Sequence, residues 1–340
     1  ALVLAGPGTG KTYVVVERVK KLVEQGVGED EILCVTFTEK ATEEMQNRLA
    51  DMGNMETKVS TFHSFCKEVC EDHLLESGIS TDSKLFKETS LQVWCMQNSD
   101  MFGIDPSVID MGKDNAALFK GMVQAISNFK ESLITSSEFQ TWLDAKSDEI
   151  NKMSEDERVN NAELIEYVRY HIEFNKVYAE YERFQKDNNV YDFDDLIKKA
   201  IYLLKNNSLV LNSYTQKYKY ILVDEFQDNN FGQYELVRLL GQNGNVMVVG
   251  DDNQLVMRFQ GARQANFAEF KKQFANVQEY HLTENFRSTK EIIGFANLFL
   301  ENIDDRIDKE NKTSRTGEKV QIVRPDKEDG QTEFIINTIR

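Results

Sequence analysis

The pattern of apolar and polar positions divides the chain into regions of different character. In residues 1–62 and 191–287, short apolar runs alternate with stretches in which apolar residues recur at helical spacing. We predict strands at residues 2–5, 32–37, 58–62, 220–223, 246–249 and 279–282, with intervening helices that include 39–52. Apolar strands that alternate with amphipathic helices are typical of an α/β fold with a parallel sheet.

The region between these two parts, residues 63–190, has no convincing strand pattern. Apolar residues lie three and four positions apart in 85–96, 116–129 and 162–186, which predicts a mostly helical insertion. The polar stretch 147–161 is predicted to be a loop.

The last region, from Ser288 onward, has the pattern of the start of another α/β unit. We predict a helix to about Asn302, a polar link over 304–318, a strand at 320–323 and a final helix. Because the chain begins inside an apolar run and ends inside an amphipathic one, we expect it to be part of a longer protein.

Composition limits the classes of protein to consider. The 340 residues favour two or three domains, and 41% hydrophobic residues can form a large core. With 40 basic and 57 acidic residues, the net charge of −17 argues against a basic protein that coats nucleic acid but allows a local basic groove. No apolar run approaches the ~18 residues of a membrane helix, so we expect no membrane partner. Four cysteines and no visible secretory signal fit a reduced, cytoplasmic protein.

The spacing of His63, Cys66, Cys70 and His73 invites comparison with a metal site. On one helix these residues span about 15 Å, whereas a tetrahedral zinc site holds all its ligands within ~2–2.3 Å of one ion. We therefore predict a helical stripe packed in the core.

Residues 5–12 read AGPGTGKT, between a predicted strand and a predicted helix, which is the pattern of a P-loop. Glycines allow successive backbone N–H groups to turn toward a phosphate, and the helix adds its positive end. Lys11 can reach the β- and γ-phosphates of ATP, and the Thr12 hydroxyl can hold Mg²⁺. The predicted nucleotide-binding residues here are Gly6, Gly8, Thr9, Gly10, Lys11 and Thr12.

Two carboxylates, Asp224 and Glu225, follow the apolar run 220–223. A lone Asp-Glu pair usually lies in a solvated loop, but a P-loop needs an acidic partner at the end of another strand. Asp224 suits Mg²⁺, directly or through water, and Glu225 suits the base that activates the attacking water.

Further blocks in a fixed order resemble the UvrD/Rep/PcrA family of superfamily 1 DNA helicases over nearly the whole chain. They are TFTEKA at 36–41, TFHSF at 61–65, DFDDL at 192–196, DEFQD at 224–228, VVGDDNQ at 248–254 and NFRS at 285–288. Each block alone is weak evidence, whereas their order makes chance implausible.

The resemblance implies a RecA-like P-loop NTPase domain that carries a mostly helical insertion domain. Residues 1–75 and 190–287 would form domain 1A, 76–189 domain 1B, and 288–340 the start of a second RecA-like domain, 2A. The family couples Mg-ATP hydrolysis to movement, normally 3′ to 5′, on single-stranded DNA or 3′-tailed duplexes, in pathways that also involve repair or replication proteins.

The resemblance also assigns residues. Gln254 senses the γ-phosphate, Arg287 is an arginine finger that contacts the nucleotide, and Gln227 lies near the nucleotide and the attacking water. On the DNA side it assigns Phe37, Phe193 and Phe259 as stacking platforms, Thr61 and His63 as strand contacts, and Met257 at a position where the family stacks a tyrosine.

The chain departs from the family pattern mainly on the DNA side. Met257 has no ring to stack, Gln260 stands where an arginine is usual, Glu39 where an asparagine is usual, and Asn253 where an aspartate is usual. A non-motor DNA-binding or regulatory subunit that keeps the fold is therefore the alternative function. A small-molecule kinase would leave the TFHSF and NFRS blocks without a role.

Overall fold

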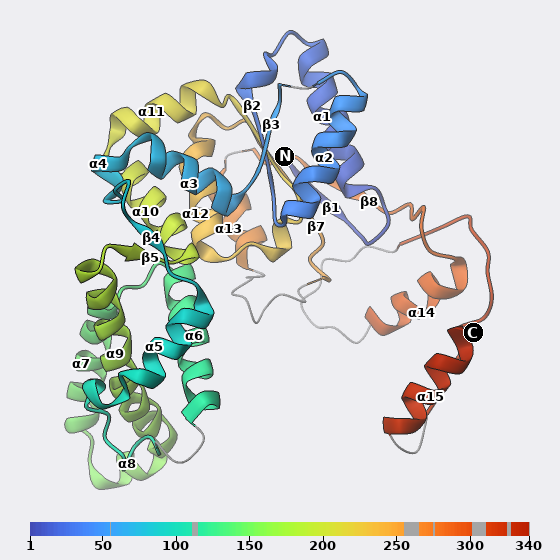
Figure 1. Cartoon of the computed structure of the whole chain (residues 1–340). Helices are drawn as coiled ribbons and strands as arrows, with labels where there is room; N and C mark the ends of the chain where they lie inside the picture. Colours follow the sequence, from blue (N-terminus) through green and yellow to red (C-terminus); the bar gives the residue numbers. More distant parts are fainter. Residues whose placement is uncertain are drawn as a thin grey trace.

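The structure is a computed structural model of the chain, and it describes residues 1–54, 56–110, 115–254, 265–274, 276–300, 311–324 and 328–339. Its central feature is a parallel six-stranded sheet with the strand order β3-β2-β6-β7-β1-β8 (Figure 1). The strands are β1 (Leu2–Ala5), β2 (Ile32–Thr36), β3 (Lys58–Thr61), β6 (Tyr220–Val223), β7 (Val246–Gly250) and β8 (Glu279–Leu282). The α/β prediction and all six predicted strands of this sheet are confirmed.

Helices cover both faces of this sheet. Successive strand residues point to opposite sides, and because the central strands are mostly apolar, both faces must be buried. One core contains Val3 and Leu222 and packs under the first two helices, α1 (Lys11–Glu24) and α2 (Glu39–Asp51). The other core contains Leu2 and Ile221. Its helices are α3 (Phe62–Asp72), α4 (Leu74–Ser77), α10 (Phe193–Asn206), α11 (Ser208–Lys217), α12 (Phe231–Leu240) and α13 (Ala265–Gln273).

The insertion forms a second helical body with its own core (Figure 1). Its helices are α5 (Glu88–Gln97), α6 (Asn115–Glu131), α7 (Ser136–Asn151), α8 (Glu155–Asn160) and α9 (Ala162–Asp187). Short 3-10 helices lie at Glu29–Glu31, Ser99–Phe102, Phe226–Asp228 and Gly241–Asn243.

Three predicted features of the chain are wrong. The stretch 147–161 is mostly helical, because α7 runs to Asn151 and Ser154 begins α8 with a capping box. The prediction that residues 63–190 contain no strand is also wrong. Strand β4 (Lys84–Leu85) pairs in parallel with β5 (Val190–Tyr191) at the base of the insertion, and each strand is too short to leave a periodic signal in the sequence. Residues 320–323 are irregular and exposed, and no described strand pairs with them.

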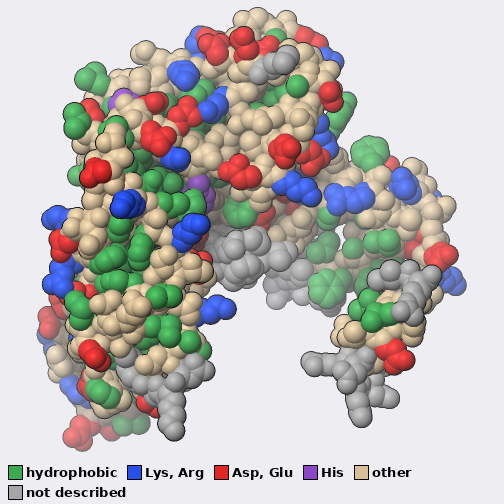
Figure 2. All heavy atoms as spheres, viewed as in Figure 1, with side chains coloured by type: hydrophobic (Ala, Val, Ile, Leu, Met, Phe, Trp, Pro, Cys, Tyr) green, Lys and Arg blue, Asp and Glu red, His purple; other side chains and the backbone are tan. Residues whose placement is uncertain are grey.

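The tail contains α14 (Lys290–Leu300) and α15 (Glu328–Ile339), both as predicted in type. Both helices expose apolar side chains, among them Phe295, Phe299 and Phe334. Figure 2 shows hydrophobic side chains on the surface of this part of the chain. In the described part of the chain, no helix is both long and apolar enough to cross a bilayer. Cys66 and Cys70 are buried in the core of the sheet domain, as the packing interpretation predicts.

Candidate functional site

The P-loop connects the end of β1 to the start of α1. Gly8 and Gly10 adopt left-handed backbone angles, with φ of 75° and 90°, which non-glycine residues rarely adopt. The Thr9 hydroxyl donates to the Gly6 carbonyl at 2.7 Å and stabilises the turn. Lys11 is the first residue of α1 and is buried, so its side chain is held at the loop.

Strand β6 brings an acidic partner to this helix. The Thr12 hydroxyl donates to Asp224 Oδ2 at 2.8 Å, and Asp224 is only 2% exposed. Burial, and secondly the Glu225 carboxylate, raise the pKa of Asp224 to about 6. A hydroxyl and a carboxylate are hard oxygen ligands of the kind that Mg²⁺ prefers, so these two residues fit such an ion.

A chain of polar contacts runs outward from Lys11. Its Nζ lies 3.2 Å from Glu225 Oε2, and Gln227 Nε2 donates to the same carboxylate at 2.7 Å. Glu225 has a left-handed φ of 49°, an uncommon conformation that concentrates at functional sites.

The chain of contacts continues to the end of β7. Gln227 Oε1 accepts from the Asp251 backbone N–H at 2.9 Å, and Gln254 Nε2 donates to Asp251 Oδ2 at 2.5 Å. The structure therefore connects four of the predicted catalytic residues: Lys11, Glu225, Gln227 and Gln254.

Arg287 also lies against the P-loop. The Phe286 N–H donates to the Gly8 carbonyl at 2.9 Å, and the Asn285 side chain donates to the Pro7 carbonyl. A Cβ placed on Gly8 would lie 2.7 Å from Arg287 Cβ, so the glycine permits this close approach.

Three of the predicted DNA residues, Phe37, Thr61 and His63, lie at the same edge of the sheet, at the ends of β2 and β3. Thr36 pairs with Thr61, so Phe37 follows β2 beside the start of α3, where Thr61 is the N-cap. The His63 and Phe193 rings meet edge to face, with centroids 6.1 Å apart, and Phe193 is 51% exposed. The predicted positions Met257 and Phe259 lie outside the described residues.

Residues 1–275 match the UvrD/REP helicase N-terminal domain, and residues 280–340 match the UvrD-like helicase C-terminal domain. The chain belongs to the UvrD/Rep helicase family. This confirms the resemblance that the motifs indicated.

Individual relatives agree with this assignment. ATP-dependent DNA helicase PcrA of Staphylococcus aureus is 32% identical over 348 residues, which cover 99% of this chain and 43% of the relative. ATP-dependent DNA helicase Rep of Salmonella typhimurium is 32% identical over 307 residues, covering 88% and 41% respectively. The chain therefore spans less than half the length of these relatives.

Some residues at the site of this UvrD/Rep-family chain make contacts that the sequence pattern does not predict. Asn311 lies so close to the loop that a Cβ on Gly6 would come within 2.5 Å of its Oδ1. Glu39 accepts a hydrogen bond from the Ser64 hydroxyl at 3.1 Å and from the Thr61 hydroxyl at 3.4 Å. Burial lowers the pKa of His63, although the nearby Glu39 carboxylate acts in the opposite direction.

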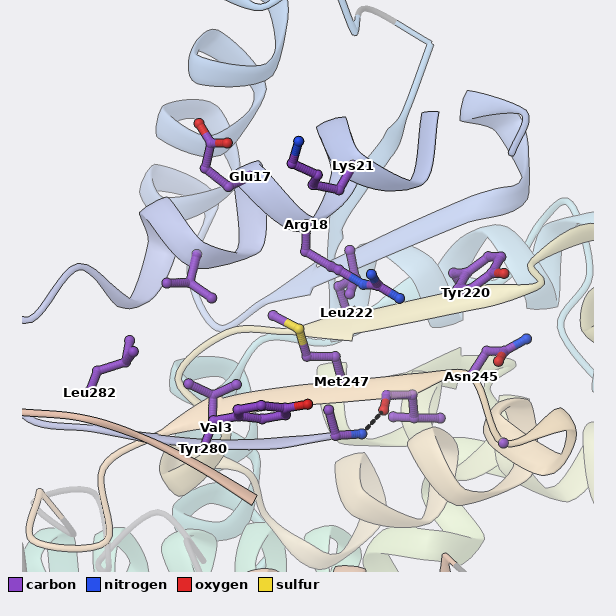
Figure 3. A pocket seen from close by; sticks show the side chains of 14 residues that line it. Val3, Glu17, Arg18, Lys21, Tyr220, Leu222, Asn245, Met247, Tyr280 and Leu282 are labelled. Carbon is purple, nitrogen blue, oxygen red and sulfur yellow. Dashed lines mark hydrogen bonds between the residues drawn. The ribbon is translucent and has the colours of Figure 1, made fainter. Parts of the chain in front are cut away.

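An apolar recess of about 560 Å³ lies at the opposite edge of the sheet (Figure 3). Its walls combine Arg18 and Lys21 of α1 with the strand residues Val3, Leu222 and Met247. Of the predicted site residues that the structure describes, none lines this recess. Among the residues that the structure describes, the candidate site therefore lies at the carboxyl edge of the sheet and not in this recess.

We predict that the Asp224 carboxyl group titrates near pH 6 in the nucleotide-free protein. Glu225→Gln removes a neighbouring negative charge and is expected to lower the Asp224 pKa, while burial keeps it above the ordinary value of about 3.9. Carboxyl carbon shifts of ¹³C-aspartate-labelled protein, followed across the acidic range, measure both values. An ordinary Asp224 pKa in the parent protein would contradict the burial of this carboxylate.

Proposed function

We propose that the full-length protein is an ATP-dependent DNA helicase or translocase that moves 3′ to 5′ on single-stranded DNA. It would act in the cytoplasm, on single-stranded DNA or 3′-tailed duplexes, with partners from DNA repair, replication or recombination. The observation that carries the proposal is the polar chain from Lys11 through Glu225, Gln227 and Asp251 to Gln254. It joins the P-loop to the motif that begins at the end of β7.

The proposal includes a division into domains. Residues 1–75 and 190–287 form domain 1A, 76–189 form domain 1B, and 288–340 begin domain 2A. Separate hydrophobic cores for the sheet and the insertion support the first two assignments. The exposed apolar side chains of α14 and α15 support a tail whose remaining packing partners belong to the rest of domain 2A.

In the proposed reaction, backbone N–H groups of the P-loop and Lys11 bind the phosphates of ATP. Thr12 and Asp224 would hold Mg²⁺, which supplies positive charge to the β- and γ-phosphates. Glu225 orients the attacking water and accepts its proton, with Gln227 holding the carboxylate. Arg287 stabilises the negative charge that develops on the transferred phosphoryl group.

On the DNA side, the exposed Phe193 ring and Phe37 offer faces on which bases can stack, independent of sequence. Thr61 and His63 would contact the strand. Glu39 accepts hydrogen bonds from the Thr61 and Ser64 hydroxyls, so its carboxylate lies beside the proposed strand contacts and would repel a nearby phosphate.

We expect single-stranded DNA to stimulate ATP hydrolysis by the full-length protein strongly, measured as steady-state turnover with and without oligo-dT. Glu225→Gln removes the proposed base and should lower turnover by about 100-fold or more while ATP still binds. An ATP turnover rate that is the same with and without oligo-dT would favour the non-motor alternative. Unchanged turnover in Glu225→Gln would show that another group is the base.

We also expect Glu39→Gln to raise the affinity for oligo-dT by up to about five-fold at low salt, because two unit charges ~4 Å apart in water interact by about 1 kcal/mol. Fluorescence anisotropy at two salt concentrations measures the effect, which should shrink as salt screens the charge. Asp51→Asn, at the far end of α2, makes the same change in net charge and is the matched control. An equal gain in both variants would contradict a local role for Glu39.

A further inference from the structure

A buried ionic cluster joins the helical insertion to the sheet domain. Its centre is Lys130, near the end of α6, whose side chain has no solvent exposure. The Lys130 Nζ lies 2.7 Å from Asp192 Oδ2, 2.8 Å from Asp195 Oδ1 and 2.9 Å from Gln185 Oε1. It also lies 4.8 Å from the centre of the Tyr181 ring, whose hydroxyl donates to Asp192.

The two aspartates have a second task at the start of α10. Asp192 is the N-cap of this helix, and Asp195 completes a capping box by accepting from the Asp192 backbone N–H at 2.9 Å. The exposed Phe193 is the residue between the cap and the rest of the turn. The backbone position of Phe193 is therefore set by two carboxylates that also contact Lys130, Tyr181 and Gln185.

Helix α6 makes one more contact with the same turn. The Ser127 hydroxyl, one helical turn before Lys130, donates to Asp194 Oδ2 at 2.6 Å. The three carboxylates of the turn at 192–195 are thus all hydrogen-bonded to side chains of α6 in the insertion. Buried carboxylates without a cation would be costly, so Lys130 is the group that permits this arrangement.

We propose that Lys130 is a positioning residue for DNA binding: from the insertion, it fixes the turn at 192–195 so that Phe193 faces His63 with its ring open to a base. This inference rests on the proposed DNA-binding role of Phe193. Lys130 itself is buried and touches no DNA, so its effect must pass through the turn.

The test is a double-mutant cycle in the full-length protein, with Lys130→Met, Phe193→Ala and the two combined. Affinity for labelled oligo-dT and affinity for Mg-ATP without DNA are both measured. We expect Phe193→Ala to weaken DNA binding by about five-fold or more, as the loss of one stacking platform does. Lys130→Met should weaken DNA binding several-fold, leave nucleotide affinity nearly unchanged, and add little in the Phe193→Ala background.

Two further variants keep the test decisive. Lys120→Met makes the same substitution at an exposed position of α6 and should leave DNA affinity unchanged. Ser127→Ala removes one hydrogen bond to Asp194 but keeps Lys130 paired with Asp192 and Asp195, so it reports on the same turn if Lys130→Met fails to fold. It should also weaken DNA binding only while Phe193 is present.

Three outcomes would overturn the inference. An equal loss in both backgrounds would show that Lys130 acts elsewhere, and parallel losses of DNA and nucleotide affinity would indicate a purely structural role. Unchanged DNA affinity in Ser127→Ala would exclude control of the turn from α6. By contrast, a Phe193→Ala variant with unchanged DNA affinity would contradict the proposed DNA role of Phe193 itself.

Discussion

The buried Asp224 carboxylate sets the conditions under which the rest of the site can be charged. Its carboxylate accepts hydrogen bonds from the Thr12 hydroxyl and the Glu225 backbone N–H, and the Glu225 carboxylate beside it adds a second negative charge. A carboxylate removed from water is stable only with a proton, a cation or further hydrogen bonds. Burial raises the pKa of Asp224 to about 6, so the folded chain binds this proton more tightly than an exposed carboxylate would, and a divalent cation can take the place of the proton. Lys11 meanwhile forms an ion pair with Glu225, so of these two neighbouring carboxylates Asp224 is the one that a divalent cation would neutralise.

The parallel sheet explains why the proposed nucleotide-binding and DNA-binding residues lie so close together. All six strands end at one edge, and β2, which leads to Phe37, is a direct neighbour of β6, which leads to Asp224. The Asp224 backbone N–H donates to the Val35 carbonyl at 3.0 Å. Only one residue separates Val35 from Phe37. One backbone hydrogen bond therefore links the acidic motif to the strand that leads to the proposed DNA-binding residue Phe37.

Most of the local features of this site could be predicted from sequence, because they depend on neighbouring residues. The glycines of the P-loop need left-handed angles, and the carboxylates of 224–225 follow an apolar strand, so both patterns are visible in a short window. The helix at Glu155–Asn160 also has a local sequence signal, the capping box formed by Ser154 and Glu157. The polar composition of this stretch nevertheless favours the prediction of a loop. Contacts between distant segments leave no such trace. Asn311 near Gly6, Glu39 on Ser64 and Lys130 on Asp192 each look like ordinary polar positions until the fold brings them together.

The charge balance bears on how such a chain would hold DNA. Acidic residues exceed basic ones by 57 to 40, and Figure 2 shows both signs interspersed on the visible face, without a continuous basic stripe. Phosphate contacts dominate the affinity of most DNA-binding proteins and make it salt-dependent. Here the proposed strand contacts have the Glu39 carboxylate beside them, which would oppose contacts to phosphates, while Phe193 is half exposed. Stacking of bases on aromatic rings needs no positive charge on the protein and would therefore supply a larger share of the affinity for DNA. Precise placement of the Phe193 ring by the insertion then matters more than it would in a strongly basic protein.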